Sequence, residues 1–155
     1  MVLKRVIFLL IFLSCSRQDS IKVTYIEPYH YYTPYEISCI DAINAIRADN
    51  GLNALILHNG LSELAKGHAD YLALNGVVNH DNFGDRLYAA KGMGFESLSE
   101  NIAYGYTNVK SLVNAWLNSL EHKEVLLDDR VTFDGFAIGI DSDGRYYYVQ
   151  LFSHR

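Results

Sequence analysis

The stretch FDGFAIGIDSDGRYYYVQLF (133–152) decides the fold class of this chain. Aromatic and aliphatic residues fill its two halves, which predicts strands at 133–140 and 145–152. The DSDG sequence (141–144) between them consists of typical turn residues. The end of the chain is therefore expected to form an antiparallel hairpin.

Helical periodicity dominates the sequence ahead of this hairpin. Thr33 and Glu36 match a capping box and Pro34 suits a first helical turn, so a helix is expected to begin here. Gly51 supplies the signal for its end. Isoleucines recur between these signals at helical spacing, at positions 37, 40, 43 and 46.

Three further helices are expected. One begins near Asn59 and ends at Asn75 and Gly76, and a brief one is capped by Asp85 and runs to Ala90. The last carries apolar residues at helical spacing, namely Val109, Leu112, Val113, Trp116, Leu117 and Leu120. Helices first and a hairpin last predict an α+β domain with helices packed on a sheet.

The first fifteen residues, MVLKRVIFLLIFLSC, have the pattern of an export signal. Lys4 and Arg5 precede an apolar run at 6–13, which is far shorter than the ~20 residues that a transmembrane helix needs. We therefore expect a signal peptide over residues 1–14.

Cys15 follows a small residue at the end of this run, as in the lipobox of bacterial lipoproteins. Phe12 departs from that pattern, which usually has leucine at this position. The resemblance implies that Cys15 is acylated and becomes the mature N-terminus. An outer-membrane or cell-surface protein outside the cytoplasm, attached to the membrane through Cys15, is expected.

Residues 15–33 are interpreted as the lipidated N-terminus and a tether, and residues 34–155 as the folded domain. Several tyrosines make the tether aromatic, and their rings are expected to pack on the domain. If Cys15 carries lipid, Cys39 has no partner for an intramolecular disulfide. The isoleucines around Cys39 indicate a buried structural thiol.

The charge of the chain argues against a nucleic-acid partner. Removing the signal takes away two of the 13 basic residues and none of the 18 acidic ones, so the net charge changes from −5 to −7. An acidic protein without a basic stripe repels phosphate backbones.

Three polar residues at element ends or in loops are the candidates for a functional site. His80 lies in VVNHDNF, Glu100 opens ENIAYG, and His122 lies at the end of the last predicted helix in WLNSLEHK. The other histidines receive structural interpretations: His68 as a core residue, and His30, His58 and His154 as residues without a functional role.

Six stretches together resemble the CAP superfamily of cysteine-rich secretory, antigen 5 and pathogenesis-related 1 proteins, in its bacterial SCP-like form. They occur in the family order: AINAIRADNGLNAL (42–55), LSELAKGHADYLALNG (61–76), VNHD (78–81) followed by DRL (85–87), SENIAYGY (99–106), AWLNSLEH (115–122) and DGRYYYVQLF (143–152). The resemblance implies an α-β-α sandwich with a central antiparallel sheet.

It also implies a cleft lined by His80, Glu100 and His122. The second glutamate of many eukaryotic members falls near Ser119 and is absent here. Glu121 stands where bacterial relatives often have glycine, and it is interpreted as a solvated residue because helix neighbours point to different sides.

Two imidazoles and a carboxylate can serve three purposes, and the sequence does not choose among them. His80 and His122, with or without Glu100, can hold zinc or another divalent cation. The same groups can act as general acid and base, or they can form a hydrogen-bonded structural cluster.

Catalysis has little support in the sequence. There is no G-x-S-x-G elbow and no H-E-x-x-H helix. The leading hypothesis is a monomeric binding module for an extracellular protein or lipid ligand. The alternatives are a metal-dependent or histidine-assisted hydrolase of extracellular peptide or envelope material, and a lipid or sterol carrier.

Overall fold

The structure is a computed structural model that describes residues 29–155. The predicted signal peptide, the predicted lipidation site Cys15 and the tether up to residue 28 lie outside the described residues. The elements follow in the order α1 (Pro34–Asp49), β1 (Ile56–Leu57), α2 (Asn59–Asn75), α3 (Phe83–Gly92), β2 (Ser99–Tyr104), α4 (Val109–Asn118), α5 (Leu120–Leu126), β3 (Phe133–Ile140) and β4 (Tyr146–Ser153).

The sheet has the strand order β1-β3-β4-β2. The predicted hairpin is confirmed, because β3 and β4 pair antiparallel from Phe133↔Ser153 to Ile140↔Tyr146. β2 adds to the other side of β4, also antiparallel. The two residues of β1 pair parallel with β3, so the sheet is antiparallel apart from this short edge.

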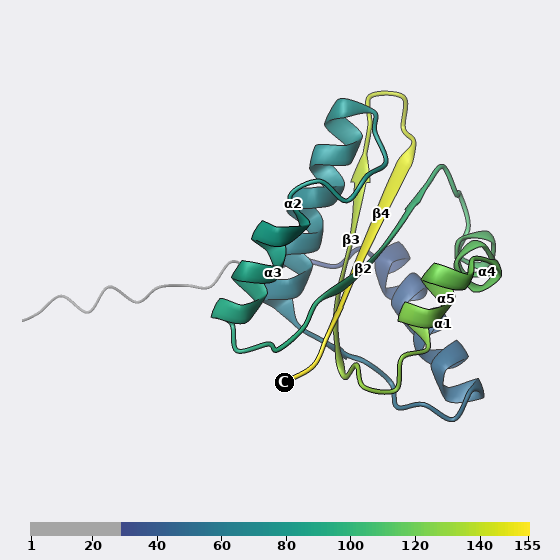
Figure 1. Cartoon of the computed structure of the whole chain (residues 1–155). Helices are drawn as coiled ribbons and strands as arrows, with labels where there is room; N and C mark the ends of the chain where they lie inside the picture. The colour runs from purple at the N-terminus through teal and green to yellow at the C-terminus, as the bar shows by residue number, and fades with distance from the viewer. Residues whose placement is uncertain (1–28) are drawn as a thin grey trace, which may run out of the picture.

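Helices cover both faces of the sheet, as the α-β-α prediction requires (Figure 1). On one face, Leu61, Ala65 and Leu72 of α2 pack with Val149 and Leu151 of β4. On the other face, α1 and α4 pack with the alternate residues of the hairpin, through Cys39, Ile43, Leu112, Trp116, Phe136 and Tyr148. The sheet thus separates two apolar cores, which confirms the sandwich.

The first two helices form where the sequence predicts them. Thr33 is the N-cap of α1 and forms both halves of the capping box with Glu36. α2 ends at Gly76, whose left-handed backbone (φ 63°) glycine adopts without strain. None of the helices formed by residues 29–155 is long and apolar enough to cross a membrane.

Two expectations from the sequence are corrected, and one strand was missed. The brief helix α3 begins after Asn82 rather than after Asp85, which lies in its first turn. The last predicted helix is two helices, because the backbone at Ser119 is extended (φ −98°, ψ 122°), and His122 therefore lies in α5. β2, which contains Glu100, was not predicted as a strand.

The chain is part of the fold several residues ahead of α1. His30 is buried and its backbone N–H donates to Asn59 Oδ1 at 2.7 Å. Tyr32 is half-buried, with its hydroxyl 2.6 Å from Ser62 Oγ. Tyr29 and Tyr31 remain exposed.

Candidate functional site

Glu100 is the centre of the candidate site. It lies on β2, opposite Leu151 of β4, and its side chain is only 1% exposed. Its Oε1 accepts hydrogen bonds from Arg86 Nη2 and from His80 Nδ1, each at 2.7 Å. Its Oε2 is buried and has no hydrogen-bond partner among the described residues. The carboxylate is therefore an internal anchor for two cationic or polar side chains.

His80 lies in the loop between α2 and α3, with 57% of its side chain exposed. Because an ionised carboxylate only accepts hydrogen bonds, the contact with Glu100 places the imidazole proton on Nδ1. The Nε2 atom then keeps its lone pair for a ligand or a proton. Glu100 thus fixes both the orientation and the tautomer of His80.

Two further residues lie beside Glu100 and were not predicted from the sequence to belong to the site. Arg86 of α3 is buried, and it also donates to the backbone carbonyl of Asp81 at 2.8 Å. His68 of α2 lies 4.0 Å from Glu100 and bonds to the Asn79 carbonyl at 2.9 Å through Nε2. Burial lowers the pKa of His68, so this core histidine is neutral near pH 7. The one available signal for Arg86 was the DRL stretch that contributes to the family resemblance.

His122 reaches the same region from α5. Its backbone carbonyl accepts from the side chain of Asn101, the neighbour of Glu100, at 2.9 Å. Its Nδ1 lies 2.8 Å from Ser119 Oγ. Burial lowers the pKa of His122, and the electrostatic influence of His80 lowers it further. The three predicted residues therefore lie in one region, although only His80 and Glu100 are in contact.

The described residues do not form a complete metal site. Among residues 29–155, no group of three or more histidine, cysteine, aspartate or glutamate side chains is placed to hold a metal ion. Glu100 already binds Arg86 and His80, so the site offers two imidazoles, fewer than the three protein ligands of a typical catalytic zinc site. The remaining ligands of a cation would have to come from a bound molecule or from water.

The interpretation of Cys39 as a buried thiol is confirmed. Its side chain is fully buried, and burial raises its pKa to about 12, so no reactive thiolate forms at neutral pH. Trp116 lies in the core, and Glu121 is exposed as predicted. His58 caps α2 by accepting from the Leu61 N–H, and His154 bonds to Ser97.

Comparisons with known proteins identify bacterial relatives of this chain. An uncharacterised membrane protein of Bacillus subtilis is 34% identical over 128 residues, which are 79% of this chain and 35% of that protein. An uncharacterised protein of Borreliella burgdorferi is 31% identical over 73% of this chain and 74% of its own length. A second uncharacterised protein of Bacillus subtilis is 28% identical over 121 residues, which are 76% of this chain and 46% of that protein. This chain therefore spans less than half of the length of either Bacillus subtilis relative.

A solved structure has a similar fold. An outer surface protein of Borrelia burgdorferi superposes with a TM-score of 0.71 at 29% identity, covering 83% of this chain and 99% of that one. The cysteine-rich secretory protein family, CAP, matches residues 40–152, which include all four strands and all five helices in part or in full, and the three predicted site residues. This chain therefore belongs to the CAP family of cysteine-rich secretory proteins.

Proposed function

We propose that this protein is a binding module outside the cytoplasm, held at a membrane by a lipid on Cys15. Its ligand site is formed by His80 and His122, with Glu100 as the residue that positions His80. The observation that carries this proposal is the burial of Glu100 beneath Arg86 and His80. A carboxylate in this position orients an exposed imidazole and does not itself reach a substrate.

The arrangement suits binding better than hydrolysis. Glu100 Oε1 accepts from Arg86 and His80, and Oε2 is buried, so neither oxygen is presented at the surface as a general base. The Cys39 thiol is buried and inert. The Ser119 hydroxyl, at the start of α5, is hydrogen-bonded to His122 of the same helix. The two imidazoles remain as polar groups that can bind an acidic side chain, a carbonyl group or a cation.

The proposed location rests on the N-terminal sequence and on two relatives. One is described as a membrane protein and the other as an outer surface protein. The chain spans only about a third of the first of these, so membrane attachment through Cys15 is inferred mainly from the lipobox-like sequence.

A zinc titration tests whether a cation is part of the ligand. Zinc binding to the purified chain would be compared with binding to a His80→Ala/His122→Ala variant and to a His154→Ala control, whose histidine lies outside the site. If the cation binds here, the double variant loses this binding and the control retains it. Equal binding by all three proteins would exclude the metal hypothesis.

A substrate screen distinguishes the binding module from a hydrolase. Peptides, esters and envelope fragments would be incubated with the wild type and with Glu100→Gln, which keeps the shape of the side chain. We expect no turnover by either protein. Turnover by the wild type that the variant lacks would favour the hydrolase instead.

Lipid carriage is a second candidate function, favoured by a mostly apolar cavity of about 390 Å³ between α1 and α4. Ala42, Ile46, Val109 and Val113 contribute its apolar surface, and Lys110 and Asn114 contribute polar groups. Ala45→Trp places a large ring at this cavity. If the cavity carries lipid, the variant binds a fluorescent fatty acid more weakly than the wild type, and equal binding excludes this route.

A further inference from the structure

The outer edge of β3 opens onto an apolar part of the molecular surface. β1 pairs with β3 only at Phe133 and Asp134, so no strand lies beside Ile138 and Ile140 in the described part of the chain. α1 and α2 rise on the two sides of this edge (Figure 1). The space between them is a hollow of about 510 Å³.

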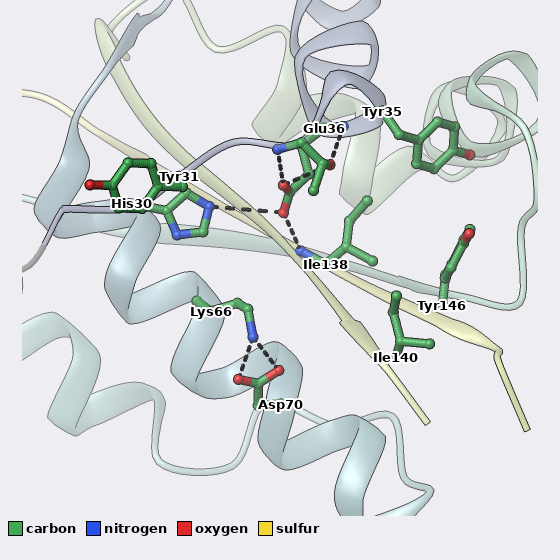
Figure 2. A pocket seen from close by; sticks show the side chains of 10 residues that line it. His30, Tyr31, Tyr35, Glu36, Lys66, Asp70, Ile138, Ile140 and Tyr146 are labelled. Atoms are coloured by element: carbon green, nitrogen blue, oxygen red, sulfur yellow. Dashed lines mark hydrogen bonds and ion pairs between the residues drawn. The ribbon is translucent and has the colours of Figure 1, made fainter. Parts of the chain in front are cut away.

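Large apolar side chains surround this hollow and remain exposed. Figure 2 shows Tyr31 on one side of the hollow and Ile140 with Tyr146 on the other. Tyr31 is 83% exposed and Ile140 is 59% exposed. The ring of Tyr29, which is 66% exposed, packs edge-on against Tyr31 with 5.0 Å between the ring centroids. These four residues are called the edge face, and an exposed apolar cluster of this kind is typical of an interaction surface.

The backbone that carries the two tyrosines of the edge face ahead of α1 is fixed to α2. The N–H of His30, the residue between them, donates to Asn59 Oδ1 at 2.7 Å, and its side chain is buried. The hydroxyl of Tyr32 lies 2.6 Å from Ser62 Oγ. The two rings therefore protrude from a fixed position, so a contact with them costs little further ordering of the chain.

The edge of β3 is not prepared to receive the strand of a partner protein. The Phe136 N–H donates to Ser62 Oγ at 3.2 Å, and the Ile138 N–H donates to Glu36 Oε1 at 3.0 Å. Strand addition needs a row of free backbone groups, and two successive N–H groups of this edge already have side-chain partners. The edge face therefore offers side-chain contact rather than backbone pairing.

The chemistry of the edge face suits the interface between a neutral lipid and water. Tyrosine is enriched at this interface because its ring is apolar and its hydroxyl is polar. Lys66 and Asp70 line the same hollow and pair with each other at 2.6 Å. Because the chain from Cys15 onward has a net charge of −7, an anionic surface would repel it.

The position of the predicted anchor brings the edge face close to a bilayer. Residues 15–28 lead from Cys15 directly to Tyr29. Their backbone spans at most about 50 Å, so a lipid on Cys15 keeps Tyr29 within that distance of the membrane. A short link of this kind raises the effective concentration of the two surfaces, so a weak contact is sufficient.

We propose that the edge face lies against the bilayer that holds Cys15, with Tyr29, Tyr31 and Ile140 at the level of the lipid headgroups. The proposal rests on the lipid anchor of the proposed function and adds the orientation of the domain. The strand order places β2, which carries Glu100, at the opposite edge of the sheet from β1 and β3. The histidine site therefore faces away from the membrane and remains open to a ligand.

Fluorescence quenching on vesicles tests this orientation. The chain from Cys15 onward would be coupled through the Cys15 thiol to a maleimide lipid in phosphatidylcholine vesicles with brominated acyl chains. Cys39 does not compete, because it is buried and its pKa is raised to about 12. Tyr31→Trp reports on the edge face, and Leu120→Trp reports on α5, where Leu120 is 72% exposed. Trp116 is buried and gives both variants the same background.

We expect the added indole of Tyr31→Trp to be quenched several-fold more strongly than that of Leu120→Trp. Equal quenching of the two variants, or none in Tyr31→Trp, would overturn the proposal. Because the lipid is attached chemically, such a result contradicts the orientation and not the anchor. The anchor itself is tested separately by lipid labelling of Cys15 in the native host.

Further variants show which side chains make the contact. Ile140→Ser added to Tyr31→Trp should reduce the quenching several-fold, whereas Leu120→Ser, at an exposed leucine of α5, should leave it unchanged. Adding phosphatidylserine should weaken the quenching, and equal effects of the two serine variants would contradict the assignment. Sedimentation of the uncoupled chain tests a rival occupant, since a dimer that Ile140→Ser dissociates would assign the edge face to a second copy.

Discussion

Three carboxylates are buried among residues 29–155, and each is stabilised differently. Glu36 accepts from backbone N–H groups of two elements, so it joins the start of α1 to the edge of β3. Glu100 is paired with Arg86 and His80. Asp134 accepts from Gln150 Nε2 at 2.9 Å, and its Oδ1 has no hydrogen-bond partner among the described residues. We therefore expect that removing the charge of Glu100 and removing the charge of Asp134 have opposite effects on the free energy of unfolding.

Removing the charge of Glu100 should destabilise the protein. Arg86 is only 8% exposed and would keep a buried positive charge without its carboxylate partner. Breaking a buried pair in this way costs about 3 to 5 kcal/mol, so we expect this loss in the free energy of unfolding for Glu100→Ala. Glu100→Gln should cost less, because the amide oxygen still accepts from Arg86. Urea unfolding measures both values.

An exposed pair provides the control for this measurement. Lys66 and Asp70 pair on the surface of α2, where their side chains are 40% and 54% exposed. Exposed pairs contribute about 1 kcal/mol or less, so Asp70→Ala should have little effect. A cost for Glu100→Ala as small as that for Asp70→Ala would show that Glu100 does not anchor the site.

Removing the charge of Asp134 should instead stabilise the protein above pH 6. Burial raises the pKa of Asp134 from 3.8 to about 6. The folded protein therefore keeps a proton between about pH 4 and pH 6 that the unfolded chain has released. The free energy of unfolding falls as pH rises through this window, by about 2 to 3 kcal/mol.

Asp134→Asn should abolish this fall, since its amide carries no charge at any pH. The nearby Arg47 keeps its bonds to the carbonyls of Asn53, Leu126, Asp128 and Val131, so it does not need the aspartate to stay in place. Urea unfolding from pH 4 to pH 8 measures the slope, and Asp129→Asn at an exposed position is the control. A variant that keeps the slope of the wild type would assign the pH dependence to another group.

At the scale of elements, two glycines of β3 allow α2 to lie directly on the sheet. A Cβ atom on Gly139 would come within 2.2 Å of the Ala69 carbonyl oxygen, and one on Gly135 within 2.2 Å of the Leu61 carbonyl carbon. Both neighbours are backbone atoms, which cannot move without shifting the helix. The FDGFAIG sequence therefore sets the distance between α2 and the sheet.

Gly139→Ala should accordingly destabilise the protein by several kcal/mol, on the order of 3, because overpacking here displaces backbone. Gly67→Ala is the matched control, since α2 has open space at that position. Alanine there should stabilise the helix by about 0.5 to 1 kcal/mol. Thermal unfolding of the two variants gives the comparison, and equal shifts in Tm would contradict the close approach of α2.

Elements with local signals could be predicted, and the others could not. The capping box of α1 and the turn of the hairpin are written in adjacent residues. β2 has no such signal, because most of its residues are buried and no polar alternation is present. The break between α4 and α5 occurs at Ser119 without a glycine or proline. Tertiary packing sets these two features.

At the scale of the whole molecule, the candidate site could also be predicted from the sequence only in part. His80, Glu100 and His122 follow from the family resemblance, and the fold brings them to one region. Arg86 was missed because its role appears only when α3 lies beside β2. His30 was assigned to the tether, although the folded chain buries it against α2 and Glu36. Such roles depend on contacts between residues distant in sequence.

The attachment of the whole molecule to a membrane gives the last prediction. Cys15 is the expected acylation site, and Ser16, which follows it, is not the acidic residue that retains some lipoproteins at the inner membrane. Metabolic labelling with a fatty acid in the native host should mark the wild type and leave Cys15→Ala unlabelled. Because several acyl chains hold a protein stably on a bilayer, the wild type should sediment with membranes and the variant should not. Cys39→Ala is the control, since its thiol is buried in the folded domain, and it should keep the label. Label on Cys15→Ala would place the lipid elsewhere, and an unlabelled wild type would leave the export signal as an ordinary cleaved one.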